Sequence, residues 1–306
     1  MPLVIAIVVI TVLSFLSYQR SSVWKDKLSI WSDTVAKSPG NSKAHNELGT
    51  AYMELGKTKE ALKHYKEAIR INPRSGIAIV NLGSALLKSG RFSEAAKEYR
   101  LAIKLAPYDS YAFYNYALAL TSLGKLDQAA QAYTRAIELN PVETNSINNL
   151  ANIYMRKNNL IKATALYTRA VEIEPGHVQA LNNLGLIMSK KGEYEKSLSY
   201  FERAAKAEPG YSEAHYNMGI TLKELGRSKD ALREYHRAVE LNPAHAGAMN
   251  NIGAILLKEN DYAGAYRYFK EALSVEPQSP IYKTNMNIAA KRMKKPPSPA
   301  PQPIKP

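Results

Sequence analysis

Prolines recur along this chain at a constant spacing of 34 residues. The series has eight members: Pro39, Pro73, Pro107, Pro141, Pro175, Pro209, Pro243 and Pro277. A fixed period of this size indicates a stack of similar supersecondary units, each of which buries its apolar face only against its neighbours. Because proline cannot continue a helix, each of these residues marks the end of one unit. The sequence therefore predicts a repeat solenoid.

Aligning the sequence on these prolines gives seven contiguous units. They span residues 42–75, 76–109, 110–143, 144–177, 178–211, 212–245 and 246–279. The eighth place of every unit holds a small residue: Gly49, Gly83, Ala117, Ala151, Gly185, Gly219 or Gly253. The twenty-fourth place is always aromatic: Tyr65, Tyr99, Tyr133, Tyr167, Phe201, Tyr235 or Phe269. Small residues let two helices approach closely, and the ring fills the space beside them.

A glycine or an asparagine stands between the two apolar stretches of every unit. These residues are Gly56, Gly90, Gly124, Asn158, Gly192, Gly226 and Asn260. Both residue types tolerate the left-handed backbone conformation that closes a helix. On either side of them, apolar residues fall three and four positions apart, which is the period of an amphipathic helix. Each unit is therefore expected to form a helix, a tight turn and a second helix.

The pattern of small residue, aromatic residue and proline resembles the tetratricopeptide repeat, and the resemblance covers residues 42–279. It implies an all-α fold, namely a right-handed superhelix, or α-solenoid, of antiparallel helix pairs. It also implies that the first helix of each pair lines a concave groove that binds peptides or segments of other proteins.

The flanks of the repeats have their own expected roles. Residues 20–41 are expected to form a linker and a half-repeat cap, in which Trp31 takes the aromatic place. Residues 280–295 are expected to form a helix that caps the other end, because an open stack needs a solvated terminal element. Residues 296–306 are rich in proline and are expected to be a disordered tail of extended polyproline character.

Residues 3–18 form an uncharged apolar run. As a helix this run would be roughly 24 Å long, slightly less than a hydrocarbon core of about 30 Å, and a snorkelling Arg20 could make up the difference. A cleaved signal peptide is disfavoured because no charged residue precedes the run. A buried soluble helix is disfavoured because all sides of the run are apolar. We therefore expect residues 1–19 to be a single transmembrane anchor.

The side of the membrane on which the repeats lie is left open by two opposing signals. Positive charges such as Lys25 follow the apolar run, which favours cytoplasmic repeats. In contrast, Arg20, Trp24, Leu28, Trp31, Pro39 and Asn41 resemble the junction between the last span and the repeats of multi-span membrane mannosyltransferases. That resemblance implies periplasmic or other extracytoplasmic repeats. The chain lacks the many spans and the acidic catalytic loop of those enzymes, so their activity is not expected here. The resemblance implies instead that this chain could be a detached part of such a system.

Asparagine occupies the sixth place of six consecutive units. We refer to these residues as the asparagine ladder: Asn81, Asn115, Asn149, Asn183, Asn217 and Asn251. Asparagine inside a helix costs roughly 0.5–0.7 kcal/mol relative to alanine, so helix propensity does not explain the series. The ladder resembles that of the repeat domain of O-linked N-acetylglucosaminyl transferases, which implies contact with the backbone of a bound peptide. The alternative is inherited packing, in which each amide bonds to a neighbouring helix.

Further residues of the first helices are expected to line the same groove. Tyr111 and Tyr114 add aromatic surface, and Asn148 and Asn182 add amides at the fifth place. A segment with apolar anchors and acidic neighbours would fit this series of surfaces. A carboxylate clamp of the kind that binds acidic chaperone tails is not expected, because its lysine and asparagine places hold Asn46 and Thr50.

The composition excludes several kinds of chemistry. The chain has no cysteine, which rules out disulfides and thiolate sites. Its six histidines show no metal-binding spacing, and the sequence around Gly56 and Lys57 lacks the first glycine of a phosphate loop. The net charge of +14 is spread among acidic residues rather than gathered in a basic stripe, which argues against nucleic acid. We expect no enzyme activity, metal, cofactor or small-molecule substrate.

Taken together, these features predict a membrane-anchored scaffold. It would bind extended segments of partner proteins in its concave groove to assemble a complex, and it would attach to the membrane through residues 3–18. The alternative function is that of an accessory or acceptor-binding part of a membrane glycosyltransferase system.

Overall fold

The computed structural model describes residues 9–12 and 26–294, and all regular secondary structure within them is helical. The predicted membrane anchor lies outside the described residues apart from residues 9–12, and the predicted proline-rich tail lies wholly outside them. Within the described ranges, no helix combines the length and the apolar character needed to cross a membrane.

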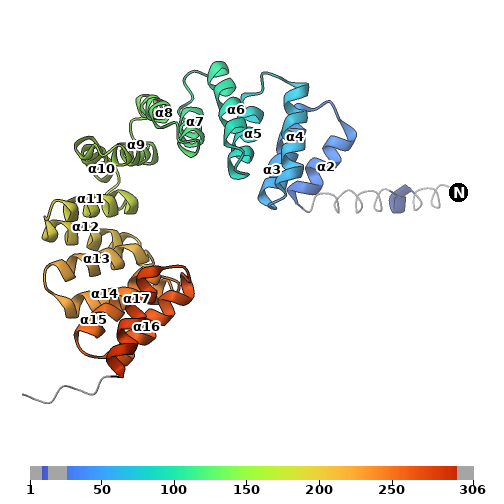
Figure 1. Ribbon diagram of the computed structural model, residues 1–306. Coiled ribbons are helices and arrows are strands. Elements are labelled where there is room, and N and C mark those ends of the chain that lie inside the picture. The colour runs from blue at the N-terminus through green and yellow to red at the C-terminus, as the bar shows by residue number, and fades with distance from the viewer. Residues whose placement is uncertain (1–8, 13–25, 295–306) are drawn as a thin grey trace, which may run out of the picture. The chain divides into compact units, whose positions relative to one another are not determined.

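Helix α2 (Lys27–Lys37) precedes seven helix pairs (Figure 1). Each pair joins a first helix of 13 residues to a second helix of 14. The pairs are α3 (Ser42–Glu54) and α4 (Thr58–Ile71), α5 (Gly76–Lys88) and α6 (Phe92–Leu105), α7 (Ser110–Ser122) and α8 (Leu126–Leu139), α9 (Thr144–Arg156) and α10 (Leu160–Ile173), α11 (Val178–Lys190) and α12 (Tyr194–Ala207), α13 (Ser212–Glu224) and α14 (Ser228–Leu241), and α15 (Ala246–Lys258) and α16 (Tyr262–Val275). Helix α17 (Pro280–Met293) follows the last pair.

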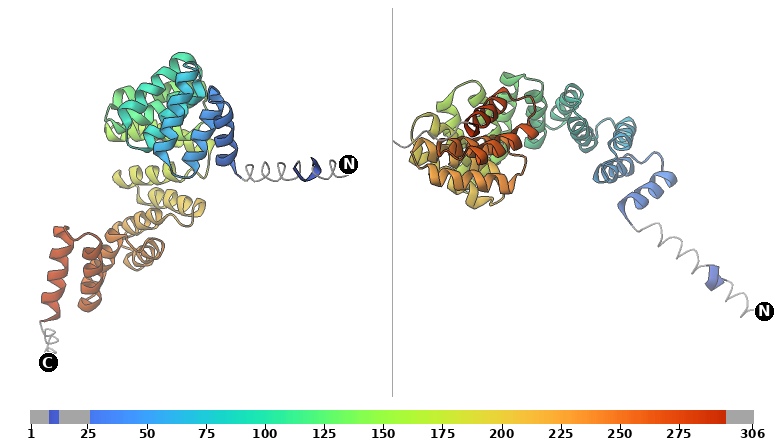
Figure 2. Two further views of the ribbon diagram at one scale, coloured as in Figure 1. Left: turned by 90° about the vertical axis from the view of Figure 1, so that its right-hand side faces the viewer. Right: turned by 60° about the horizontal axis from the view of Figure 1, so that its bottom comes forward.

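The chain divides into two compact units, residues 1–153 and 154–306. In each unit the main contacts join helices that follow one another along the chain, as Figure 2 shows. Weaker contacts join successive first helices, such as α5 with α7 in the first unit and α11 with α13 in the second. This nearest-neighbour pattern is that of an α-solenoid within each unit. The hand of a superhelix over all seven repeats stays a prediction.

The turn inside each pair depends on a residue with a left-handed backbone. The φ angles are +70° at Gly56 and +66° at Asn260, and the other five turns hold their glycine or asparagine in the same region. With this conformation the backbone folds back, so that the N–H of Lys57 donates to the carbonyl of Tyr52 at 2.9 Å. The expected closing role of these residues is therefore confirmed.

Every first helix except α13 begins with a side-chain cap supplied by the residue just before it. In the first unit Asp109 accepts from the N–H of Ala112, and in the second His245 accepts from the N–H of Ala248. Such a cap satisfies one of the N–H groups that a helix start leaves unpaired. The thirty-fourth place of the repeat thus has a structural role at the edge of the next first helix.

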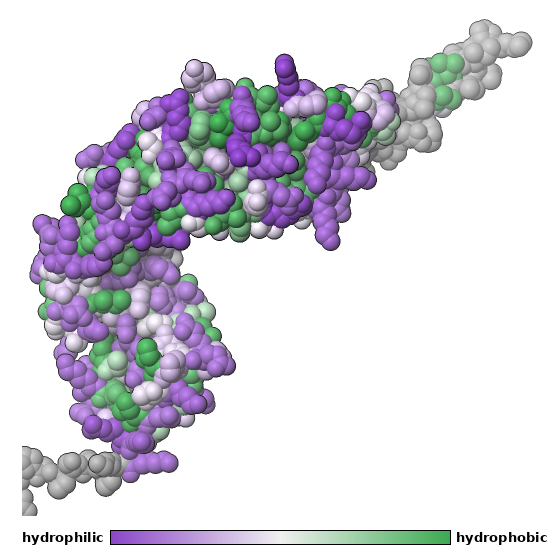
Figure 3. Space-filling model, turned by 45° about the horizontal axis from the view of Figure 1, so that its top comes forward, coloured by the Kyte–Doolittle hydropathy of each residue, from purple (hydrophilic) through white to green (hydrophobic). Residues whose placement is uncertain are grey.

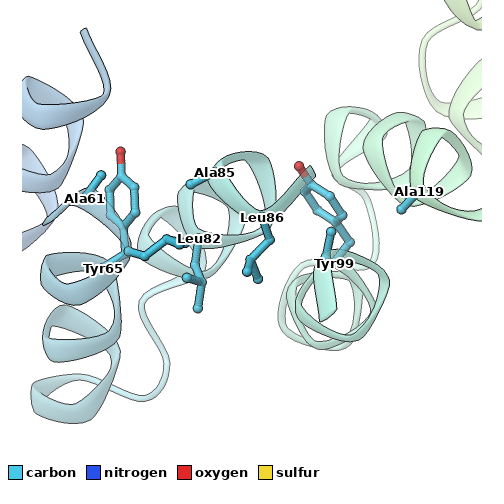
Figure 4. Close-up of a cluster of buried hydrophobic side chains, with 9 residues drawn as sticks. Ala61, Tyr65, Leu82, Ala85, Leu86, Tyr99 and Ala119 are labelled. Atoms are coloured by element: carbon cyan, nitrogen blue, oxygen red, sulfur yellow. The ribbon is translucent and has the colours of Figure 1, made fainter. Parts of the chain in front are cut away.

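The core of each repeat is an aromatic ring set against a small residue. Tyr99 is fully buried beside Gly83, where an added Cβ would lie only 2.9 Å from the ring. Figure 4 shows Tyr65 and Tyr99 with Leu82 and Leu86 between successive helices of the first unit. The fully buried rings at this place are Tyr99, Tyr133, Tyr167, Phe201, Tyr235 and Phe269. The close approach expected between small and aromatic residues is confirmed.

Helix α17 covers the apolar end of the second unit. Its Ala289 is fully buried against Ala265 and Phe269 of α16. Counted as a further first helix, α17 carries Asn287 at the eighth place, where every preceding repeat has glycine or alanine. An asparagine there would obstruct the ring of another second helix, so α17 suits the end of the stack. At the other end α2 packs on α3, and Lys27 Nζ lies 2.7 Å from Glu54 Oε1.

Candidate functional site

The second place of the repeat is exposed on six of the seven first helices. In the first unit, Ile77 and Tyr111 are 71% and 55% exposed although both side chains are large. Their helices α5 and α7 contact each other, so these side chains share one face. In the second unit Gln179 and Glu213 stand exposed at the equivalent places. Over the face that Figure 3 shows, apolar side chains alternate with hydrophilic ones.

The asparagine ladder lies deeper than the second-place residues. Asn115 and Asn217 are buried, and Asn81, Asn149, Asn183 and Asn251 are half-buried. Asn148 and Asn182 at the fifth place are also buried. These amides therefore stand where one helix meets the next, rather than at the outermost surface of the first helices.

Hydrogen bonds connect amides of neighbouring repeats. Asn81 Nδ2 donates to Asn46 Oδ1 at 2.9 Å, and Asn217 Nδ2 donates to Asn182 Oδ1 at 2.9 Å. Asn285 Nδ2 of α17 donates to Asn250 Oδ1 at 2.8 Å. In each case the sixth place of one repeat donates to the fifth place of the repeat before it.

Where the preceding fifth place lacks asparagine, the ladder residue has a different partner. Burial raises the pKa of Tyr114, and a hydrogen bond with Asn149 opposes that shift. Burial likewise raises the pKa of Tyr216 against a hydrogen bond with Asn251. Asn115 follows a repeat with valine at the fifth place, and its Nδ2 donates instead to the carbonyl of Tyr111 at 2.9 Å. The partner of each of these amides thus depends on the residue at the preceding fifth place.

This pattern gives the ladder a structural role between repeats. Each of these hydrogen bonds uses one of the two hydrogens of an amide, which leaves capacity for a second contact. The bonds support the packing interpretation, while contact with a ligand stays a prediction. Asn148 differs from Asn182, because its Oδ1 is buried without a hydrogen-bond partner among the described residues.

Tyr111 and Tyr114 meet at a cavity of about 260 Å³ in the first unit. We call this cavity the tyrosine pocket. It is lined by Ser110, Tyr111, Tyr114, Ala136, Asn140, Glu143, Asn145 and Ser146. The two predicted tyrosines are therefore brought together, with α7, α8 and the start of α9 around them.

Two polar groups of the tyrosine pocket, on Glu143 and Ser146, were not predicted from the sequence. Glu143 caps α9, with Oε2 accepting from the N–H of Ser146 at 2.6 Å. Ser146 is only 1% exposed, and its hydroxyl has no hydrogen-bond partner in the described part of the chain. The repeat alignment held a signal for Glu143, since it stands at the capping place, where glutamate is an uncommon residue.

Asn285 also escaped the sequence reasoning. It follows Asn251 by one further repeat length, so extending the repeat period would have predicted it.

No group of three or more histidine, aspartate or glutamate side chains is arranged to hold a metal in residues 9–12 and 26–294.

Comparison with known families identifies the repeats. Family models described as tetratricopeptide repeat match residues 42–75, 80–143 and 246–279. A model described as the fifth ARM repeats domain of TT21 matches residues 143–257. No curated protein matches the chain. The resemblance of residues 20–41 to a mannosyltransferase junction involves residues outside the described ranges and stays a prediction.

Solved structures share the fold. The APC/C hetero-tetramer Cut9–Hcn1 matches with a TM-score of 0.64 and 18% identity, over 86% of this chain and 52% of that one. A tetratricopeptide repeat protein from Parabacteroides merdae matches with a TM-score of 0.63 and 19% identity, over 81% of this chain and 98% of that one. YrrB, described as having an unusual peptide-binding site, matches with a TM-score of 0.50 and 22% identity, over 63% of this chain and 99% of that one. At these identities the likeness concerns the fold.

Proposed function

Because this chain is a tetratricopeptide repeat protein, we propose that it is a scaffold that binds extended segments of partner proteins on the face of its first helices. By holding such segments it would bring partner proteins together in a complex. YrrB, a structure of the same fold, is described as having a peptide-binding site, which supports a peptide as the kind of ligand.

The observation that carries this proposal is the row of exposed second-place side chains. Single exposed apolar residues are normal on a protein surface and need no explanation. Here, however, Ile77 and Tyr111 occupy the same repeat place on two contacting helices, and Tyr111 also lines the tyrosine pocket. Both side chains are exposed, so the row is available as anchoring surface for an extended segment.

The asparagine ladder would support binding from beneath this row. Asn81 and Asn217 each hold their neighbouring repeat with one hydrogen. The remaining hydrogen and the free acceptor sites of each amide suit the alternating donors and acceptors of an extended backbone. In this proposal the ladder first fixes the spacing of the repeats and then offers its unused capacity to the ligand.

Attachment to a membrane is a further part of the proposal. Its support is the uncharged apolar run of residues 3–18. Such a run would act as a single-pass anchor, with the repeats on either the cytoplasmic or the extracytoplasmic side. A reporter fused after Pro306 would distinguish the two sides, and recovery of the full chain in the aqueous phase of a detergent partition would contradict the anchor.

The binding face is tested by recovering partners with the full chain as bait. The double variant Ile77→Ala and Tyr111→Ala removes two exposed anchors, so partner recovery is expected to fall while the melting temperature stays the same. Tyr108→Ala is the matched control, because Tyr108 is 81% exposed but stands at the thirty-third place, outside the row. If the double variant and the control recover partners as well as the parent chain does, the proposed face is wrong.

A further inference from the structure

We propose that the tyrosine pocket receives a lysine or arginine side chain of the bound segment. This inference rests on the proposed function and adds the chemistry of one subsite. It differs from the expectation of apolar anchors flanked by acidic residues, because the pocket has its own negative charge. The size of the cavity, its charge, its rings and its unpaired hydroxyl support it independently.

The size of the pocket fits one side chain. Pockets that hold drug-sized ligands have volumes of about 300–1,000 Å³. The tyrosine pocket, at about 260 Å³, falls below that range. A single long side chain of a segment lying across α7 and α9 is therefore a better match than a separate small molecule.

The charge of the pocket comes from one carboxylate. Glu143 is the only charged member of the eight residues that line it in the described structure. Its Oε2 is held by the N–H of Ser146, which fixes the side chain at the wall. A carboxylate has about four acceptor sites, so this one bond leaves acceptor capacity for a cation. In a chain with a net charge of +14, the pocket is a local exception.

The rings of the pocket add a second attraction for a cation. The face of a tyrosine ring carries negative potential and attracts ammonium and guanidinium groups. Tyr114 is held in place by an edge-on contact with Tyr133, with 6.0 Å between the ring centroids. Tyr111 is 55% exposed at the mouth of the pocket, where it can close over an entering side chain.

The hydroxyl of Ser146 requires a partner that a cationic side chain can supply. A buried polar group without a hydrogen bond carries an energetic penalty, and a donor that enters the pocket would relieve it. Lysine offers three donors and arginine five, whereas an aliphatic side chain offers none. An acidic side chain would also face repulsion from Glu143.

The second unit contains a filled counterpart of this arrangement. Tyr216 stands at the repeat place of Tyr114, and His245 stands at that of Glu143. There the imidazole of His245 lies over the tyrosine, with 4.5 Å between the ring centroids. A group from the chain itself thus covers the tyrosine in the second unit. Both residues cap the helix that follows them, but Glu143 has no ring to lay over Tyr114, so in the first unit that ring is left to a ligand.

The inference is tested with peptides selected against the full chain. A random library of 12-residue peptides is expected to yield binders with lysine or arginine enriched at one position. For one such binder, replacing that residue with norleucine should weaken binding about tenfold, measured by fluorescence anisotropy, as loss of a partly desolvated cation contact would. With the Glu143→Gln chain, which keeps the capping oxygen but loses the charge, that difference should nearly vanish.

Two further variants separate the pocket from general charge and from folding. Glu138→Gln on α8 removes one carboxylate from the same unit outside the pocket, and it should leave the preference for the cation unchanged. Tyr111→Ala alters an exposed ring and should reduce the preference without lowering the melting temperature, so the test does not depend on Glu143→Gln folding normally.

The outcomes distinguish this inference from the proposed function. If selected peptides bind the first-helix face without an enriched cation, or if Glu143→Gln and Glu138→Gln act alike, the cation subsite is wrong and the scaffold stands. If no peptide binds, or if Ile77→Ala with Tyr111→Ala leaves all binding unchanged, the proposed face and the subsite are both wrong.

Discussion

At the scale of single residues, paired amides join neighbouring repeats through hydrogen bonds that the repeat period alone does not reveal. Asn182 and Asn217 are both buried and bond to each other across a repeat boundary. Changing either one to alanine leaves the other without its partner, which typically destabilises a protein by about 1–3 kcal/mol. The double variant should be less destabilised than the sum of the two single variants, because the unpaired group is then gone. Urea unfolding of the four chains measures this coupling, and strictly additive effects would contradict it.

A histidine pair in the first repeat makes stability depend on pH. His45 Nε2 donates to the carbonyl of Pro39, so its Nδ1 accepts from His64 Nδ1 at 3.1 Å. Burial lowers the pKa of His64, and the nearby His45 and Lys63 lower it further against the opposing charge of Glu67. The unfolded chain therefore binds a proton at His64 more readily than the folded chain does.

This difference in proton binding means that the folded chain loses stability as the pH falls. Stability is intact above the ordinary histidine value of about 6.5 and falls as the pH drops from there through the lowered pKa of His64. Melting temperatures measured between pH 7.5 and pH 5 should decline more steeply for the parent chain than for His64→Gln. Parallel declines in the two chains would show that His64 does not contribute.

The sequence could predict which residues form the ladder, but not what each one bonds. Asparagine at the sixth place is visible from the period alone. For Asn81 and Asn217 the partner is the fifth-place asparagine of the repeat before, whereas Asn115, which follows a valine at that place, bonds to its own helix. Asn81 and Asn46 are 35 residues apart in the sequence and meet only in the folded chain. Neither local propensity nor helical periodicity could therefore reveal their hydrogen bond.

At the scale of helices, the approach of α5 to α6 depends on the absence of a side chain at Gly83. An alanine there would place its Cβ 2.9 Å from the Tyr99 ring. That ring is fully buried, and its hydroxyl lies 2.9 Å from Ser84 Oγ, so it has little freedom to move. Gly83→Ala should destabilise the chain by about 1–2 kcal/mol, because overpacking outweighs a gain in helix propensity of about 1 kcal/mol.

Gly76 on the same helix is the matched control. An added Cβ at Gly76 has nothing within 4 Å, so Gly76→Ala should be neutral or stabilising by up to about 1 kcal/mol. Urea unfolding compares the two variants directly. Equal effects at both glycines would show that the ring at Tyr99 does not limit the distance between the helices.

The helices themselves were predictable because three local signals agree. Proline ends each second helix, glycine or asparagine ends each first helix, and the small and aromatic residues follow the helical period between them. Helix α3 accordingly begins at Ser42, the first residue of the first predicted unit. The tyrosine pocket was less predictable, since Tyr114 and Glu143 stand near opposite ends of one repeat and line the same cavity only in the folded chain.

At the scale of the whole molecule, stability is distributed among neighbouring repeats rather than held in one central core. In such a stack each terminal element protects only the repeat next to it. Helix α17 makes its main contacts with α16, where Ala289 completes a cluster with Ala265 and Phe269. Its removal should therefore act locally, while a change in a single globular core would act on the whole fold.

Truncation tests this expectation. A chain ending at residue 279 exposes the buried ring of Phe269, and burying such a side chain is typically worth about 1.5–3 kcal/mol. Hydrogen exchange should accelerate throughout α15 and α16, with progressively smaller changes in α14 and α13 and none in α3–α8. A chain ending at residue 294 keeps α17 and serves as the control, with exchange like that of the parent chain. Uniform acceleration over all helices would mean that the repeats unfold as one cooperative body, and the nearest-neighbour account of this protein would then be wrong.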